Sequence, residues 1–223
     1  MKVRTRKQRC AILGGGGHGA VLIEAAMASR LIVPVCVLDA DKTRWGKDLL
    51  GIPIVGGDEL LGTLAADGVT SFVIGVGGTG DNGPRRRLYE RALAAGLHPC
   101  TIRHPSAVVS PSAILGEGTV VLAGAIVGTR AVAGVNVIVN SGAICEHDCV
   151  IGDHVHLASG ATLAGGVRVG EEAHIGAGAT IREQLSIGAR AVVAAGAVVI
   201  RSVRDGDKVA GVPAASLSLR SSS

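Results

Sequence analysis

From Val109 onward, aliphatic residues recur at every sixth position of the chain. In sixteen consecutive blocks of six, the first place is Val, Ile or Leu fourteen times and Ala or Cys in the other two. The fifth place is small in fifteen blocks, and Gly is common at the second place, as at Gly116 and Gly152. A period of six fits neither an amphipathic helix nor a single alternating strand. It predicts a three-sided solenoid of about five coils, with aliphatic side chains inside and Gly easing the turns.

The preceding part of the chain has a different pattern. Short apolar stretches that end in Gly or Asp alternate with segments of helical periodicity, which predicts a small parallel α/β sheet. We expect strands at 9–13, 34–38 and 71–76, and helices at 20–30 and 85–95.

The first predicted strand runs into a glycine-rich loop. Gly14, Gly16 and Gly19 satisfy the pattern G-x-G-x-x-G, and Asp39 follows twenty residues after the last of them. Glycines here would let a phosphate or hydroxyl approach free N–H groups at the start of a helix, and Asp39 would accept hydrogen bonds from a sugar or ribose. A tight strand–helix turn is the alternative. The domain is short for a full dinucleotide fold, which disfavours NAD relative to a nucleotide sugar.

Composition and charge limit the possible partners. The 223 residues include 34 Gly but only one Trp, one Tyr and one Phe, so the interior must be filled by small aliphatic side chains. The net charge of +4 comes from five basic residues among the first nine, and the rest of the chain carries 17 basic and 18 acidic residues. A nucleic-acid surface is therefore not expected. The basic residues of this N-terminal arm are Lys2, Arg4, Arg6, Lys7 and Arg9.

Cysteine usage and hydropathy predict where the protein resides. No apolar run approaches the ~20 residues of a membrane span, and no signal peptide is recognisable. The five cysteines are irregularly spaced, which is typical of reduced thiols. We therefore expect a cytoplasmic protein without membrane association.

One charged triplet lies within the repeat. Cys145 and Cys149 occupy inward places of their hexad, so Glu146, His147 and Asp148 should lie on the outside of the coil. A carboxylate beside an imidazole raises its basicity and suits a general base. An ordinary solvated surface is the competing interpretation.

A second pair of histidines, His156 and His174, differs by eighteen positions, or one full coil. The two imidazoles should therefore stack on one edge, where they would either bind a divalent metal or pack together without one. The metal interpretation corresponds to a zinc hydrolyase resembling the γ-class carbonic anhydrases. Those proteins usually use three histidines, and spacing places only two here.

Several motifs occur in a characteristic order: Gly17-His18-Gly19, Leu38-Asp39, a glycine segment from Gly75, Asn140 through His147 to Gly152 inside the repeat, and Gly211-Val-Pro-Ala. In this order they resemble the hexapeptide-repeat sugar O- or N-acyltransferase family, of the UDP-N-acetylbacillosamine N-acetyltransferase and sialic acid O-acetyltransferase type. The resemblance implies a Rossmann-like α/β domain at 9–100, which binds a nucleotide-sugar acceptor, and a left-handed parallel β-helix at 101–215.

The resemblance also implies a homotrimer with active sites between adjacent β-helices and acetyl-CoA as the donor, without a metal. By motif, His147 is the general base and Asp148 its neighbour, although family members often have Glu at the latter position. The other roles implied by the resemblance are acceptor binding by Gly16, Gly17, His18, Asp39 and Asn140, and CoA binding by His156 and the main chain at Ala177 and Ala195.

We therefore expect an acetyl-CoA-dependent N-acetyltransferase acting on a nucleotide-linked amino sugar. His147 would take a proton from the amine as it attacks the thioester. Three alternatives remain open on the sequence: O-acetylation of a sugar such as sialic acid, a zinc hydrolyase, and a non-catalytic rod that only trimerises.

Overall fold

The computed structural model describes residues 7–217 and divides into two compact units. Residues up to Gly77 together with Pro84–Pro105 form the first unit, and Gly78–Gly83 together with the residues from Ser106 onward form the second. The three basic residues before position 7 lie outside the described residues. None of the helices described is both long enough and apolar enough to cross a membrane.

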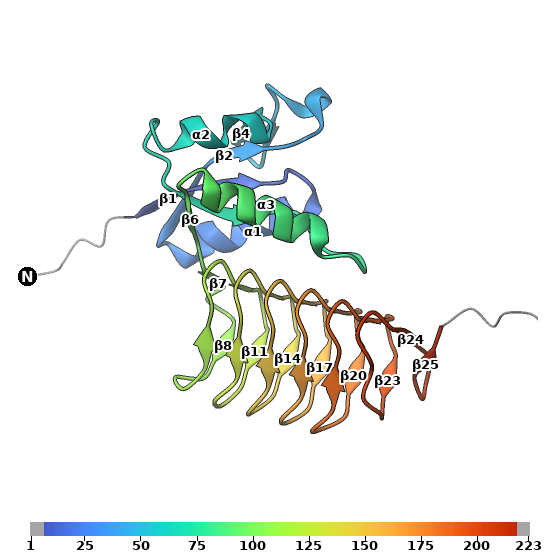
Figure 1. Cartoon of the computed structure of the whole chain (residues 1–223). Helices are drawn as coiled ribbons and strands as arrows, with labels where there is room; N and C mark the ends of the chain where they lie inside the picture. The colour runs from blue at the N-terminus through green and yellow to red at the C-terminus, as the bar shows by residue number, and fades with distance from the viewer. Residues whose placement is uncertain (1–6, 218–223) are drawn as a thin grey trace, which may run out of the picture. The chain divides into compact units, whose positions relative to one another are not determined.

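The first unit is built on a six-stranded sheet with strand order β3-β4-β2-β1-β5-β6 (Figure 1). All neighbours pair in parallel except β3 with β4. This confirms the predicted parallel α/β arrangement. The strands are β1 (Gln8–Leu13), β2 (Ile32–Leu38), β3 (Asp48–Leu49), β4 (Ile52–Gly56), β5 (Ser71–Ile74) and β6 (His98–Pro99), with β7 (Ile102–Arg103) following them.

The helices of the first unit differ from expectation mainly at their starts. Helix α1 begins at Gly17, three residues earlier than predicted, and ends before Arg30, whose left-handed φ of 61° terminates it. Strands β3, β4 and β6 and the short helix α2 were not predicted, because their short segments lack a sustained period. The helices are α1 (Gly17–Ser29), α2 (Leu61–Leu64) and α3 (Gly83–Ala94), and the 3-10 turns are η1 (Lys42–Arg44) and η2 (Asp58–Leu60).

The second unit is a three-sided parallel β-helix, as the hexad pattern predicts; Figure 1 shows its coils stacked one behind another. From β8 to β20 each strand pairs with the strand eighteen residues later, as Val120 does with Ile138. The last coil is two residues shorter, since Val192 pairs with Lys208. The first wall contains β10 (Val120–Val121), β13 (Ile138–Val139), β16 (His156–Leu157), β19 (His174–Ile175), β22 (Val192–Val193) and β24 (Lys208–Ala210), closed by antiparallel β25 (Ala215–Ser216). The second contains β8 (Val108–Val109), β11 (Ile126–Val127), β14 (Ile144–Cys145), β17 (Thr162–Leu163), β20 (Thr180–Ile181) and β23 (Val198–Val199). The third contains β9 (Ile114–Leu115), β12 (Val132–Ala133), β15 (Val150–Ile151), β18 (Arg168–Val169) and β21 (Ser186–Ile187).

The interior of the β-helix follows the predicted phase. Every first-place residue from Val121 to Val199 is buried, and the small fifth-place residues fill the space beside them. The interior is therefore narrow and lined by small aliphatic side chains, which explains how a chain with three aromatic side chains other than histidine builds a continuous core.

The turns differ from the prediction. The left-handed residue of each hexad from Gly118 to Gly196 is at the fourth place, where φ lies between 53° and 72°. The second-place glycines have another function, because a Cβ on Gly116 would lie 2.5 Å from the backbone of Gly134 in the next coil. Gly at the second place thus permits close stacking of coils rather than the turn itself.

A short glycine-rich segment belongs to the β-helical unit although it precedes it in sequence. We call Gly78–Gly83 the strap. Buried Asn82 donates from Nδ2 to the carbonyls of Glu172 (3.1 Å) and Ala173 (3.0 Å), and His156 Nδ1 is 2.8 Å from the Gly78 carbonyl oxygen. These contacts attach the strap to the first wall.

Substitution of Gly78 should weaken this attachment. In Gly78→Ala the new Cβ would collide with Asn82 Oδ1, so Asn82 must move and lose its two hydrogen bonds. We expect a loss of about 1–3 kcal/mol of unfolding free energy, measured by thermal and denaturant unfolding. Gly77→Ala is the control, because the nearest atom to its Cβ would be His18 Cβ at 3.7 Å. Equal stability of the two variants would contradict this account of the strap.

Candidate active site

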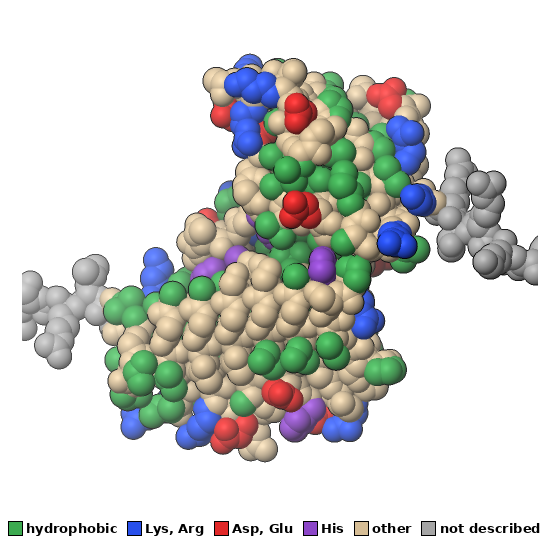
Figure 2. All heavy atoms as spheres, turned by 180° about the vertical axis from the view of Figure 1, so that it is seen from behind, with side chains coloured by type: hydrophobic (Ala, Val, Ile, Leu, Met, Phe, Trp, Pro, Cys, Tyr) green, Lys and Arg blue, Asp and Glu red, His purple; other side chains and the backbone are tan. Residues whose placement is uncertain are grey.

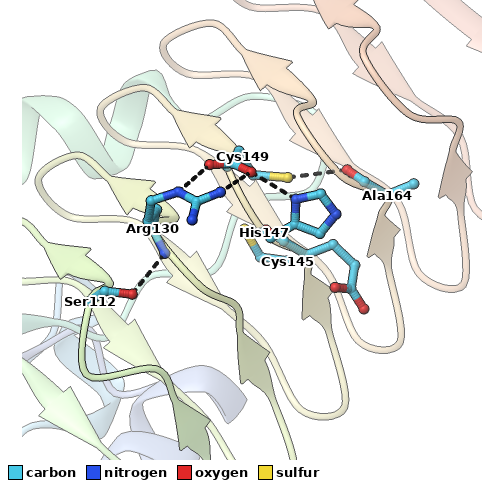
Figure 3. Close-up of polar contacts among 8 residues, drawn as sticks. Ser112, Arg130, Cys145, His147, Cys149 and Ala164 are labelled. Atoms are coloured by element: carbon cyan, nitrogen blue, oxygen red, sulfur yellow. Dashed lines mark hydrogen bonds and ion pairs between the residues drawn. The ribbon is translucent and has the colours of Figure 1, made fainter.

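His147 and Asp148 lie at a corner of the β-helix, between β14 and β15 (Figure 3). His147 Nδ1 is 2.8 Å from Asp148 Oδ2, and the His147 side chain is 61% exposed. Because an ionised carboxylate only accepts hydrogen bonds, Nδ1 carries the proton in neutral His147, and Nε2 keeps its lone pair. The geometry thus gives an outward-facing imidazole with a basic nitrogen, on the outer side of the coil as predicted.

A cation that was not predicted from the sequence binds Asp148. Arg130, one coil earlier, binds both carboxylate oxygens, with Nε 2.7 Å from Oδ1 and Nη2 2.8 Å from Oδ2 (Figure 3). The hydrogen bonds from Arg130, and then that from His147, lower the pKa of Asp148 to about 2. The signal was present in the sequence, since Arg130 and Asp148 are separated by one coil, the same interval that relates His156 to His174.

A glycine lies against the imidazole on the following coil. A Cβ on Gly165 would come within 2.6 Å of both Cε1 and Nε2 of His147. Gly165 does not have a positive φ, so its backbone conformation does not require glycine. The missing side chain leaves room for the basic edge of His147.

Neither cysteine beside the triplet is a candidate nucleophile. Cys145 and Cys149 are both fully buried in the coil, as their hexad places predict. The hydrogen bond to Cys149, together with burial, raises the pKa of Cys145 well above its usual range. The same hydrogen bond lowers the pKa of Cys149. Both thiols are nevertheless inaccessible to a substrate inside the coil, so neither is placed to act as a nucleophile.

Asn140 and His156 form a hydrogen-bonded chain with the strap. Asn140 Nδ2 is 3.2 Å from His156 Nε2, while His156 Nδ1 contacts the Gly78 carbonyl oxygen. The carbonyl accepts, so Nδ1 carries the proton and Nε2 accepts from Asn140. With both ring nitrogens engaged in this way, His156 is not arranged as a metal ligand.

His156 and His174 are neighbours on successive coils, as predicted, but their rings pack edge to face rather than stacked, with centroids 5.0 Å apart at an interplanar angle of 70°. Burial lowers the pKa of His174, which favours its neutral form. Within residues 7–217 no group of three or more His, Cys, Asp or Glu side chains is arranged to hold a metal ion.

A cleft lies beside His174 on the surface of the β-helical unit. It has a volume of about 260 Å³ and is lined by Thr79 and Gly80 of the strap and by main chain and small side chains of two coils. Ala177 and Ala195, assigned by resemblance to the donor, both line it. The cleft therefore brings together the two alanines and one side of the strap.

In the first unit, the glycine-rich loop divides into two groups of glycines. Internal packing explains the first group: Gly14 has a φ of 115°, a Cβ on Gly15 would contact the Asp39 carboxylate, and one on Gly19 would collide with the Gly14 carbonyl. Gly16 and Gly17 are exposed, with no atom within 4 Å of a Cβ at either position. Packing within the protein therefore does not account for the two glycines assigned by resemblance to acceptor binding.

The start of α1 adds to the chemistry of this loop. Gly16 is the N-cap and provides no side-chain cap, and His18 lies half-buried in the first turn. The N-terminus of a helix of 13 residues presents N–H groups and a partial positive charge, which favour an anion.

Asp39 lies at the end of β2, as predicted, but its carboxylate already has partners. Oδ2 accepts from the Gly15 N–H at 2.7 Å and pairs with Arg44, and Oδ1 accepts from the Asp41 N–H at 2.8 Å. Asp39 therefore fixes the shape of the glycine-rich loop. Its Oδ1 retains capacity for a second hydrogen bond.

Comparisons with known proteins give consistent matches. Residues 9–92 match the PglD N-terminal domain family. A stretch of 116 residues is 44% identical to UDP-N-acetylbacillosamine N-acetyltransferase of Bacillus subtilis (strain 168); it covers 51% of this chain and 50% of that protein, so the match spans half the length of that curated relative.

Solved structures match over almost the whole chain. A mutant of perosamine N-acetyltransferase from Caulobacter crescentus, in complex with CoA and GDP-perosamine, is 39% identical with a TM-score of 0.88, covering 96% of this chain and 99% of that one. The acetyltransferase domain of PglB from Neisseria gonorrhoeae FA1090, in complex with acetyl coenzyme A, is 39% identical with a TM-score of 0.87. The match covers 95% of this chain and 100% of that one. The chain therefore belongs to the family of hexapeptide-repeat sugar N-acetyltransferases that carry a PglD N-terminal domain.

Proposed function

We propose that the protein transfers an acetyl group from acetyl-CoA to the amino group of a nucleotide-linked amino sugar. The observation that carries this proposal is the outward imidazole of His147, paired with Asp148 at a coil corner, in a chain that matches sugar N-acetyltransferases over nearly its full length. The perosamine N-acetyltransferase structure holds CoA and GDP-perosamine, and the PglB structure holds acetyl coenzyme A. N-acetylation is preferred to O-acetylation because the matched relatives are N-acetyltransferases.

In the reaction, the amine nitrogen attacks the carbonyl carbon of the thioester. His147 Nε2 takes a proton from the nitrogen as the C–N bond forms, and Asp148 stabilises the resulting imidazolium. The C–S bond then breaks, and the CoA thiolate leaves and takes the proton from the His147 imidazolium, which restores the base. A main-chain N–H of the coil wall would stabilise the negative charge on the carbonyl oxygen in the intermediate.

The two substrates would bind at separate places. The cleft at Ala177 and Ala195 suits the pantetheine arm of the donor, since exposed main chain and small side chains allow an extended ligand to approach closely. His156 and Asn140 would contact donor and acceptor respectively, next to the strap. In the first unit, Gly16, Gly17 and His18 at the start of α1 would bind the diphosphate, and Asp39 would support the loop and contact the nucleoside.

We also propose that three chains associate through their β-helices, which would bring donor and acceptor sites of neighbouring chains together. Rows of hydrophobic side chains run along the outside of the β-helical unit (Figure 2). Two columns of outward residues show this. Val108 pairs with Ile126 on one wall, and Ile114 lies two coils before Val150 on another. These four side chains are 37–62% exposed. Exposed aliphatic columns of this kind are typical of an interface.

Acetyl transfer can be measured directly. The purified protein is incubated with acetyl-CoA and UDP-, GDP- or dTDP-linked 4-amino sugars, and release of the CoA thiol is followed. We expect turnover with at least one of these amines. Thiol release from none of them would contradict the proposal.

Removal of His147 should abolish most of this activity. We expect kcat of His147→Ala to fall about 10²–10⁴-fold, since the amine would lose its proton acceptor. His98→Ala replaces another exposed histidine, in the first unit, and should keep wild-type activity. Undiminished turnover by His147→Ala would refute its assignment as the base.

A side chain on the exposed glycine of α1 should act on the acceptor alone. Gly17→Val introduces a branched side chain where the protein itself leaves open space, so we expect KM for the nucleotide sugar to rise about tenfold or more while CoA affinity, measured by calorimetry, is unchanged. Gly62→Val in α2 is the matched control, because a Cβ there also meets open space. Equal losses of CoA and acceptor affinity in Gly17→Val would argue against separate sites.

A further inference from the structure

We propose that Arg130 is a positioning residue for acetyl transfer: it fixes the Asp148 carboxylate against His147 Nδ1 and shares its negative charge, which sets both the orientation of the imidazole and the charge that acts on it. The proposal rests on the proposed role of His147. It concerns a side chain that touches neither the amine nor the thioester.

Arg130 binds the Asp148 carboxylate in a bidentate manner. Arg130 Nε and Nη2 contact the two oxygens of Asp148 at 2.7 and 2.8 Å, and the second of these oxygens, Oδ2, is also 2.8 Å from His147 Nδ1. One oxygen therefore serves both cations when His147 is protonated. A bidentate pair sets the plane of the carboxylate, which sets the direction of its hydrogen bond to the imidazole.

The coil register holds this arrangement in place. Arg130 and Asp148 occupy the fourth place of their hexads, with φ of 57° and 62°, so their side chains leave the same corner one coil apart. The Arg130 N–H donates to Ser112 Oγ at 3.0 Å, and the Asp148 N–H to the Thr129 carbonyl at 2.9 Å. Arg130 is therefore held in two ways: its main-chain N–H is bonded to the preceding coil, and its guanidinium is paired with Asp148 on the following coil.

Within residues 7–217, the charges that act on the Asp148 carboxylate are those of Arg130 and His147. The preceding coil supplies Arg130, and the following coil supplies Gly165 and Gly166, which have no side chain. Next to it in sequence are His147 itself and the buried thiol of Cys149, and Glu146 precedes them.

The sign of the effect follows from competition for one carboxylate. A carboxylate beside an imidazole stabilises the imidazolium, and a cation on the same carboxylate weakens that stabilisation. Without Arg130, the full charge of Asp148 would act on the imidazolium and stabilise it more strongly. In Asp148→Asn the imidazolium would lose this stabilisation.

The decisive measurement is the pH dependence of kcat/KM. In Arg130→Met we expect the acidic limb of the profile to move up by roughly half to one pH unit, whereas in Asp148→Asn it should move down. A residue that only maintained structure would lower activity equally at all pH values. An Arg130→Met limb that coincides with that of the wild type, in an active enzyme, would overturn the proposal and leave the proposed function intact.

Arg130→Lys separates charge from geometry. Lysine keeps a positive charge near Asp148 but cannot make the planar, two-bond contact. We expect an acidic limb close to that of the wild type with a few-fold lower kcat. A limb shifted as far as in Arg130→Met would contradict the charge component of the proposal.

Arg190→Met provides a matched control. Arg190 also occupies a fourth place, has a φ of 56° and pairs with an exposed carboxylate, with Nη1 3.5 Å from Glu171 Oε1; its side chain is 59% exposed against 65% for Arg130. It should leave both the pH profile and kcat unchanged. A shift equal to that of Arg130→Met would show a general charge effect and refute the specific one.

A readout without turnover makes the two proposals distinguishable. NMR titration of the Asp148 carboxyl in the full chain should show its pKa rise from about 2 toward the usual carboxyl range in Arg130→Met, but not in Arg190→Met. An unchanged Asp148 titration would refute the ion pair. Full acetyl transfer by His147→Ala would instead refute the proposed function on which the inference rests.

Discussion

The main-chain ladder between successive coils is the constraint on which the β-helical unit depends. Hydrogen bonds such as those from Val120 to Val137 and from Ile138 to Val155, both 2.9 Å, join residues seventeen apart and keep one register from coil to coil until the shorter last coil. Because the strands are only two or three residues long, no single wall would be stable alone. The small buried side chains fill the interior only while this register holds, and so the ladder and the core support each other.

The sequence predicted the fold well because one structural rule repeats sixteen times. Because every block places its first residue inside the coil, an exception in one block does not hide the period. Ala133 and Cys145 are such exceptions, and both are buried at positions where the pattern predicts Val, Ile or Leu. Positions in the turn were harder to predict. Glycine at the second place indicates close approach of the next coil, whereas the left-handed conformation at the fourth place is adopted by Arg130, Glu172 and Gln184 as well as by glycine. Residue type alone therefore did not locate the bend.

The candidate site was predicted in its reactive groups but not in its supports. His147 and Asp148 are adjacent in sequence, so their pairing is visible in the chain itself. Arg130 and Gly165 reach the same corner only through the stacking of coils, and the strap reaches the first wall from a segment that precedes the repeat. Asp39 shows the opposite case: its position was predicted, but its hydrogen bonds with Gly15 and Asp41 are visible only in the folded loop.

The regular stacking has a consequence for how such a protein can diversify. Arg130, His147 and Gly165 come from three successive coils, so one short, continuous stretch of the sequence forms the reacting corner. The donor cleft at Ala177 and Ala195 lies in the coils that follow. Gain or loss of whole coils could therefore change chain length and outer surface outside these two regions while leaving the spacing within each of them unchanged.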